Sequence, residues 1–335
     1  MWIVSELSDV QTAQQTPDIA AESARVVQAA PELKPPRRLN IIGRRNWFFA
    51  LSLLIIIPGI FSMAKYGFQL GIDFAGGTEL TVSFANHPSL AQVEGAVAAE
   101  ADNGSVIQTQ GGYIIRYPPL TAPQQTAVQN DLQTRLGPMT VQQILEVGGT
   151  IAAETIELSL LAVVIASVAI LLLLAVRFRN VPGGWRAGFQ FGGSALAALL
   201  HDVFVLTGLF SIFGRVLHWH VGQIDAFFVT AVLTVVGFSV HDTIVVFDRI
   251  RENLRVSQRL SFEQVVNLSI MQTAARSIIT SFTVVLVLAA IFISGGSTLQ
   301  GLALALLIGI ISGTYSSIFN AAPLLVVWRR LQPLR

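Results

Sequence analysis

The stretch Ile156–Phe178 reads IELSLLAVVIASVAILLLLAVRF, and it contains no charged residue between Glu157 and Arg177. A helix needs about 20 mostly apolar residues to cross the hydrocarbon core of a bilayer, which is about 30 Å thick. A charged side chain at that depth is costly, so spans are poor in charge. The stretch therefore predicts a transmembrane helix.

Five further stretches have the length and apolar character of spans, so the chain is predicted to cross the membrane six times. The composition agrees, because 53% of the 335 residues are hydrophobic and only 12% are charged. Soluble domains carry about 25% charged residues. The predicted fold class is therefore an α-helical membrane protein. The five stretches are Trp47–Ala64, Ala187–Phe213, Ile224–Phe247, Arg276–Ile293 and Gly301–Trp328.

The distribution of Lys and Arg predicts the orientation of the spans. With a cytoplasmic N-terminus, sixteen of the 21 basic residues lie on the cytoplasmic side and four on the outer side, while Arg276 lies at the start of the fifth span. An excess of positive charge marks the cytoplasmic side of membrane proteins. Both termini are therefore expected in the cytoplasm, and the segment between the first two spans outside it.

The chain is predicted to have four parts. They are a disordered cytoplasmic tail (residues 1–45), a first transmembrane helix (46–64), an outer domain (65–150) and a five-helix transmembrane bundle with a cytoplasmic C-terminus (151–335). The tail is rich in Gln, Ala, Ser, Glu and Pro, which is typical of disordered segments. We do not expect a cleavable signal, because the apolar run that follows the tail is a full span.

The outer domain alternates between strand-like and helix-like segments in the order βαββαβ, with Gly111-Gly112 as the turn of a hairpin. Ser89 and Gln92 have the spacing of a capping box at the first helix, and Thr121 starts the second helix in the same way. This order predicts a small ferredoxin-like α+β fold. The segments are Glu79–Phe84, Ser89–Ala101, Ser105–Gln108, Tyr113–Tyr117, Thr121–Leu136 and Thr140–Val147.

Residues that the sequence lacks exclude several kinds of chemistry. It has no cysteine, so disulfides and thiolate metal sites are impossible. Neither of its two lysines, Lys34 and Lys65, follows a glycine, so no Gly-Lys-Ser/Thr phosphate loop exists. The outer domain has no cluster of His, Asp or Glu typical of a catalytic centre. We expect no enzyme activity, no cofactor, no metal and no nucleic-acid partner.

Few ionisable side chains lie inside the predicted spans. Such a group costs several kcal/mol when it is unpaired at membrane depth, so each one is a functional candidate by default. The candidates are His201 and Asp202 in the third span, His241 and Asp242 in the fourth, and Arg276 at the start of the fifth.

Asp242 and Arg276 are predicted to form a pair. The fourth span runs inward and the fifth runs outward, so both residues fall at a similar depth on neighbouring antiparallel helices. Burial favours a neutral carboxyl group, whereas a nearby guanidinium favours the ionised form. Movement of the arginine would therefore load or release a proton. Arg276 also belongs to a polar stripe whose other members lie three or four residues apart: Thr273, Thr280 and Thr283.

These segments resemble a known family. Val236–Arg255, VGFSVHDTIVVFDRIRENLR, resembles the fourth-span signature of the SecF family, which provides one subunit of the bacterial SecDF translocation motor. Gly71–Thr78, GIDFAGGT, resembles the motif that follows the first span in that family. The resemblance covers roughly residues 40–328. Further matches are Val147–Glu157, Leu200–Phe213 and Gln272–Thr283.

The resemblance implies roles for particular residues. The positions of Asp242 and Arg276 are implicated in proton transport in SecDF proteins, and Asp202 is a further candidate for that role. The family more often has Asn where this chain has His241. Because His titrates near neutral pH, His241 is expected to join the proton relay or to tune Asp242.

The resemblance also implies partners and a location. The family plan is similar to one half of a resistance-nodulation-division transporter and places the chain in the bacterial inner membrane, in contact with membrane lipid. The outer domain is then periplasmic. The expected partners are SecD, the SecYEG channel and the preprotein substrate, which the motor pulls with the proton-motive force after the SecA ATPase has acted.

Three other functions compete with this interpretation. A half-transporter of the same superfamily, exporting lipid or small molecules by proton antiport, predicts a larger outer domain than residues 65–150 provide. An intramembrane aspartyl protease would need Asp202 and Asp242 a few Å apart, and the sequence motifs of such proteases are absent. A passive scaffold for SecD would not need a buried Asp and Arg at matched depth.

Overall fold

The computed structural model describes residues 40–100, 104–109, 111–181, 183–256 and 259–333. Most of the predicted tail, residues 1–45, therefore lies outside the described residues. The prediction of disorder does not hold for residues 40–45, where Ile42–Arg44 form a short 3-10 helix, η1, and Arg45 begins helix α2. Ile41 and Ile42 are buried, and their backbone N–H groups donate to Oδ1 of Asn267. These apolar side chains fix the segment against the bundle.

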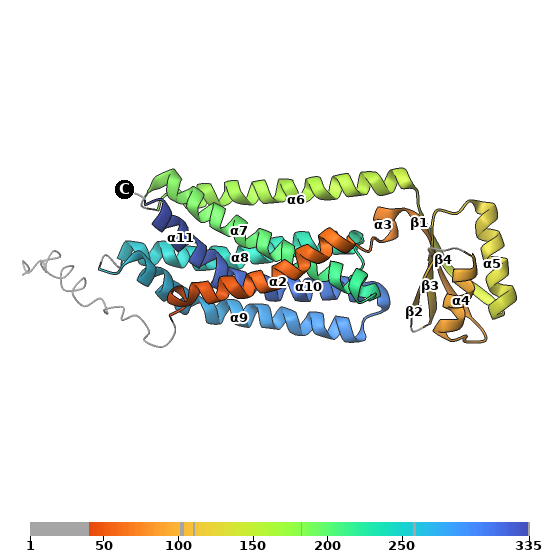
Figure 1. Cartoon of the computed structure of the whole chain (residues 1–335). Coiled ribbons are helices and arrows are strands. Elements are labelled where there is room, and N and C mark those ends of the chain that lie inside the picture. The colour runs from red at the N-terminus through yellow and green to blue at the C-terminus, as the bar shows by residue number, and fades with distance from the viewer. Residues whose placement is uncertain (1–39, 101–103, 110, 182, 257–258, 334–335) are drawn as a thin grey trace, which may run out of the picture. The chain divides into compact units, whose positions relative to one another are not determined.

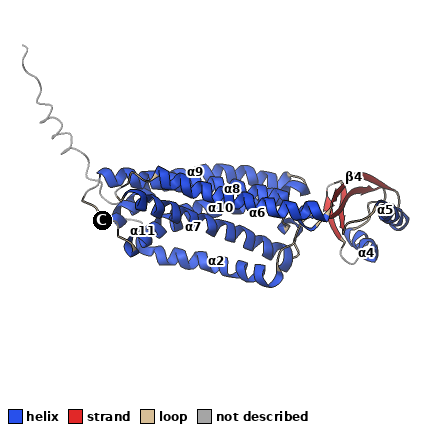
Figure 2. Ribbon diagram, turned by 90° about the horizontal axis from the view of Figure 1, so that it is seen from above, coloured by secondary structure: helices blue, strands red, loops and turns tan. Residues whose placement is uncertain are grey.

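Within the described residues, six helical segments are long and apolar enough to span a bilayer, and Figures 1 and 2 show them running alongside one another. The predicted six-span class is thus confirmed. The segments are α2 (Arg45–Tyr66); α6 (Gly149–Arg177); α7 (Gly184–Ser211) with the π-helical η2 (Ile212–Val216); α8 (Ala226–Val256); α9 (Phe262–Ser294); and α10 (Ser297–Ser316), which continues through the π-helical η4 (Ser317–Ala321) into α11 (Ala322–Leu331).

Helix α9 begins much earlier than the sequence predicted. The predicted span opens at Arg276, whereas α9 is 33 residues long and begins at Phe262. Ser261 caps it, since its hydroxyl accepts from the backbone N–H of Gln264, whose side chain in turn accepts from the N–H of Ser261. The first turns of α9 mix apolar residues with Glu263, Gln264 and Asn267, so they do not continue the uninterrupted apolar run that marks a span. Arg276 therefore lies inside a helix rather than at its start.

The segment between α2 and α6 forms an α/β domain with a four-stranded antiparallel sheet in the order β2-β3-β1-β4. Its elements follow one another as βαββαβ, as the sequence predicts, and the predicted capping box at Thr121 and Gln124 is present. The ferredoxin-like class of the domain stays a prediction. The elements are α3 (Ile72–Ala75), β1 (Gly77–Phe84), α4 (Leu90–Glu100), β2 (Ser105–Thr109), β3 (Gly112–Tyr117), α5 (Ala122–Leu136) and β4 (Met139–Val147).

The two faces of this sheet differ, because successive side chains of a strand point to opposite sides. On one face, Leu80, Val82 and Ile115 are fully buried and pack with side chains of α4 and α5. The alternate residues Glu79 and Arg116 lie on the other face, which borders a cavity shared with the segment before α8. The polar face of the sheet is therefore directed at the helical bundle.

The helices of the bundle are buried to different extents. About half of the most apolar stretch is buried in α7 (44%), α8 (50%) and α10 (50%), against 17% in α2, 11% in α6 and 17% in α9. Close packing of the inner helices depends on small residues. A Cβ atom on Gly208 of α7 would lie 2.8 Å from the Cα of Gly59 on α2, which lets the two backbones touch.

Gly208→Ala is therefore expected to destabilise the fold by about 1–3 kcal/mol, the usual cost of overpacking. Gly237→Ala on α8 is the matched control, because a Cβ there meets nothing within 4 Å. Thermal unfolding of the detergent-purified chain measures both. A Gly208→Ala midpoint equal to that of Gly237→Ala would contradict the close contact between α2 and α7.

Candidate functional site

Asp202 on α7 is buried at the centre of a hydrogen-bonded cluster. It is only 1% exposed, and its carboxylate is contacted from three helices, α7, α8 and α10. The contacts are Ser239 Oγ to Oδ2 (2.6 Å), Ser316 Oγ to Oδ2 (2.6 Å), Ser312 Oγ to Oδ1 (2.7 Å) and His201 Nδ1 to Oδ1 (3.0 Å). Three serine hydroxyls thus donate to one carboxylate, and such charge-assisted hydrogen bonds are the strong ones.

Asp242 on α8 is also buried, at 7% exposure, but its carboxylate has few partners. The hydroxyl of Ser281 on α9 donates to Oδ2 over 3.4 Å, a long hydrogen bond. Thr314 on α10 donates to the same Ser281 oxygen at 2.6 Å. The hydroxyl of Ser277 interacts with Asp242 electrostatically but has no hydrogen-bond partner in the described part of the chain.

The two buried aspartates therefore differ in the number of acceptor positions that remain free. Three short hydroxyl bonds occupy the carboxylate of Asp202, whereas one long bond reaches that of Asp242. A proton binds at a free lone pair, so Asp242 has the geometry of an acid that can exchange one. Asp202 has the geometry of a connector between helices, and its role in proton transport stays a prediction.

Arg276 does not pair with Asp242 in this structure. Its side chain is exposed on α9, and no salt bridge joins it to any of the residues described. The predicted stripe also divides, because Thr280 and Thr283 are exposed and bond to backbone carbonyls of their own helix. Four buried polar residues at four-residue spacing face the bundle instead: Ser269, Thr273, Ser277 and Ser281.

The predicted pairing of Asp242 with Arg276 fails because of the rotation of α9 about its own axis. Depth along antiparallel helices follows from the sequence, but the direction in which each residue faces depends on how the helix packs. The Arg276 face carries exposed Ile279 and Thr283, so it is the outer face of α9. His241 is likewise exposed, and no hydrogen bond connects it to Asp242 within the described residues.

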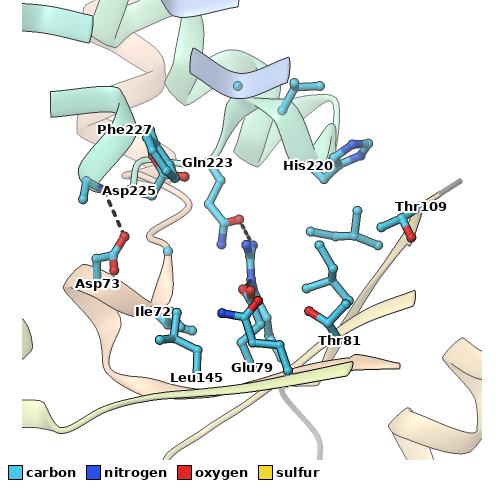
Figure 3. Close-up of a pocket in the computed structure, with 18 residues that line it drawn as sticks. Ile72, Asp73, Glu79, Thr81, Thr109, Leu145, His220, Gln223, Asp225 and Phe227 are labelled. Carbon is cyan, nitrogen blue, oxygen red and sulfur yellow. Dashed lines mark hydrogen bonds and ion pairs between the residues drawn. The ribbon is translucent and has the colours of Figure 1, made fainter. Parts of the chain in front are cut away.

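A second polar cluster lies between the α/β domain and the start of α8, around a cavity of about 610 Å³. Figure 3 shows His220, Gln223 and Asp225 on the side of the bundle, with Glu79, Thr81 and Leu145 on the side of the sheet. His220 belongs to a short 3-10 helix, η3 (His220–Gly222). No spacing pattern in the sequence indicates this cluster, because the contacts that join its two sides connect distant residues: Arg116 and Gln223 are 107 residues apart, and Asp73 and Ala226 are 153 apart.

Charges and burial act on two groups of this cluster. Burial raises the pKa of Asp225 above its ordinary value, and the neighbouring Asp73 adds to the effect. Burial lowers the pKa of His220, and the positive charge of Arg116 lowers it further.

Comparison with known proteins assigns the family. The model of "Protein export membrane protein SecD/SecF, C-terminal" matches residues 128–331, and that of the "SecD/SecF GG Motif" matches residues 61–86. The protein translocase subunit SecF of Thermobaculum terrenum is 43% identical over 311 residues, covering 89% of this chain and 96% of the relative. That of Anaerolinea thermophila is 43% identical over 297 residues, covering 87% and 94%.

Two solved structures have the same fold. A crystal structure of SecDF from Thermus, described as a translocon-associated membrane protein, superposes with a TM-score of 0.76 at 30% identity. SecDF in a super-membrane-facing form gives a TM-score of 0.63 at 28% identity. In both comparisons 89% of this chain is covered, and it spans only 39% of the SecDF chain.

The relatives are named as translocase subunits, which is a transport role rather than a catalytic one. The six apolar helices make this chain a multi-pass membrane protein of the same kind. The GG motif match includes the segment that contacts the start of α8. The chain belongs to the SecD/SecF family of protein export membrane proteins.

Proposed function

We propose that this chain is the SecF-type subunit of a motor that uses the proton-motive force to assist preprotein translocation through the SecYEG channel, together with SecD. One observation carries the proposal: Asp242 is buried within a predicted span, and its carboxylate receives a single long hydrogen bond. An acid in that position is costly to keep charged, so binding or losing a proton changes the energy of its surroundings. The naming of the relatives supports the role in export.

The exposed Arg276 on α9 is an argument for a partner subunit that contacts this helix within the membrane. A guanidinium that faces lipid in the middle of an apolar helix is costly, and Arg276 has no salt bridge in the described chain. The chain spans 39% of the SecDF chain that it resembles, which leaves room for a second set of helices in the complete assembly. SecD is therefore proposed to cover this face of α9 and to supply a carboxylate opposite Arg276.

The proposed topology places the joint between the α/β domain and α8 outside the cytoplasm. Both termini lie on the cytoplasmic side of the bacterial inner membrane, as the positive-inside rule indicates. One elementary charge that crosses 100 mV releases about 2.3 kcal/mol, which biases a two-state equilibrium about fifty-fold. Asp242 receives the proton, and the exposed His241 beside it passes the proton on or tunes the carboxylate.

Asp242→Asn tests the proposal, because the amide keeps the shape of the side chain but cannot ionise. The variant should insert normally and lose gradient-dependent export, down to the level measured without a gradient. The measurement is export of a reporter preprotein into inverted membrane vesicles that contain SecYEG and SecD. Full gradient-dependent stimulation in the variant would remove Asp242 from the relay.

Asp202→Asn is the matched comparison on the neighbouring helix. Its amide N–H₂ group would face serine hydroxyls that now donate, so the variant should lose about 1–3 kcal/mol of stability. Asp242→Asn should not show that loss. The thermal midpoints of both variants therefore separate a structural defect from a defect in proton handling.

Arg276→Ala is expected to lower the amount of SecD that co-purifies and to abolish gradient-dependent export. Removing one partner of a buried ion pair costs about 3–5 kcal/mol, which is enough to weaken a subunit contact strongly. Arg255→Ala is the control, because Arg255 is an exposed arginine near the end of α8. Unchanged recovery of SecD with Arg276→Ala would refute the proposed interface.

A further inference from the structure

The segment that leads into the α/β domain is tied to the loop before α8 by backbone hydrogen bonds. The N–H of Gly71 donates to the carbonyl of Ile224 (2.7 Å), and the N–H of Ile224 donates to the carbonyl of Gln69 (2.8 Å). Gln223 adds a side-chain bond to the carbonyl of Leu70 (3.0 Å). A Cβ atom on Gly71 would lie 2.9 Å from the Cβ of Asp225, so the two segments touch.

Two carboxylates meet at the N-terminus of α8. Oδ2 of Asp73, from α3, accepts from the backbone N–H of Ala226 at 3.0 Å, as the dashed line in Figure 3 shows. Oδ1 of Asp225 accepts from the N–H of Phe228 at 2.8 Å. Free N–H groups and the helix dipole attract negative charge to this end of a helix. One of these carboxylates comes from the α/β segment and the other from the bundle.

The sheet supplies a third connection. Arg116 on β3 forms an ion pair with Glu79 on β1 (Nε to Oε2, 2.6 Å) and donates a hydrogen bond to Oε1 of Gln223 in the bundle. The cavity of about 610 Å³ beside these groups has room for water. The contact between the domain and the bundle is therefore polar and partly open, which is typical of an interface that can separate.

The charged and titratable groups that line this cavity are Asp73, Glu79, Arg116, His220 and Asp225. Glu79 is neutralised by Arg116. Among the residues that the structure describes, neither Asp73 nor Asp225 has a cation within salt-bridge distance. The two carboxylates thus share one helix terminus without a counter-charge of their own.

We propose that this joint is a pH-sensitive latch, in which proton binding at Asp225, beside the negative charge of Asp73, favours docking of the α/β domain onto α8 and proton loss favours its release. The latch does not depend on export or on the role proposed for Asp242, although Asp242 lies on the same helix. On the proposed outer side of the membrane, the latch faces the compartment that supplies protons.

The direction of the pH effect follows from the groups themselves. In the docked state, burial raises the pKa of Asp225 above 3.8, and the charge of Asp73 raises it further; hydrogen bonding to Phe228 and the charge of Arg116 oppose this only in part. Release exposes the group and returns its pKa to the ordinary value. The docked state therefore binds the proton more tightly, so acidification through the raised pKa favours docking.

His220 acts in the opposite direction. Burial, followed by the charge of Arg116, lowers its pKa below 6.5 in the docked state. A docked His220 therefore prefers to be neutral, and acidification below its ordinary pKa opposes docking. His220→Gln removes this contribution and leaves the effect of the carboxyl pair to be measured by itself.

The absence of cysteine makes the measurement direct. In the full chain, Ala127→Cys on α5 and Val216→Cys on η2 place spin labels at two exposed positions, one on the α/β domain and one on the bundle. Pulsed electron–electron double resonance in lipid nanodiscs measures the distribution of distances between the two labels. It therefore gives the docked fraction between about pH 8 and about pH 4, the range in which carboxyl groups and His titrate.

With His220→Gln, the ratio of docked to released molecules is expected to rise on acidification, by up to about tenfold for each unit by which docking raises the pKa. Adding Asp225→Asn should give a high and pH-independent ratio, since Asn caps a helix about as well as Asp. Asp73→Asn should reduce the pH response only in part, because it removes the neighbouring charge while the burial that raises the pKa of Asp225 remains. Glu94→Gln, which removes an exposed carboxylate on α4, should leave the response intact.

A docked ratio that stays flat or falls on acidification in the His220→Gln chain would overturn the latch. So would a full pH response that survives both Asp225→Asn and Asp73→Asn. Because docking is measured without export, either result would leave the proposed function of the chain untouched.

Discussion

Inside a bilayer a carboxylate has no water to solvate it, so protein donors must take the place of water. Asp202 obtains these donors from Ser239 on α8 and from Ser312 and Ser316 on α10. The three most buried helices of the bundle are therefore joined at one point. Asp242 on α8 and Thr314 on α10 therefore lie on helices whose rotation this cluster fixes.

Helix α8 connects the two polar regions of the molecule. Its N-terminus is held by Asp73 and Asp225 at the joint with the α/β domain, and Asp242 lies further along the same helix. A helix is a rigid element, so a change at one end shifts the contacts at the other when the packing permits two arrangements. One continuous helix therefore connects Asp242 to the joint with the α/β domain.

The fold was largely predictable because long apolar runs and alternating strand patterns are local signals. The six spans and the βαββαβ order came from them. The start of α9 was missed because its first turns mix apolar and polar residues and so interrupt the apolar run. The pairing of Asp242 with Arg276 was wrong in this chain because depth does not reveal rotation. The joint was missed because Asp73 and Ala226 lie 153 residues apart, and no spacing rule connects them.

The central claim is that Asp242, and not Asp202, is the buried acid that exchanges a proton. Infrared difference spectroscopy of the full chain between acidic and alkaline buffer detects this directly, through the C=O stretch of a protonated carboxyl group. The account predicts a buried-carboxyl signal that Asp242→Asn removes and Asp202→Asn leaves in place. A signal that survives Asp242→Asn and disappears with Asp202→Asn would contradict it.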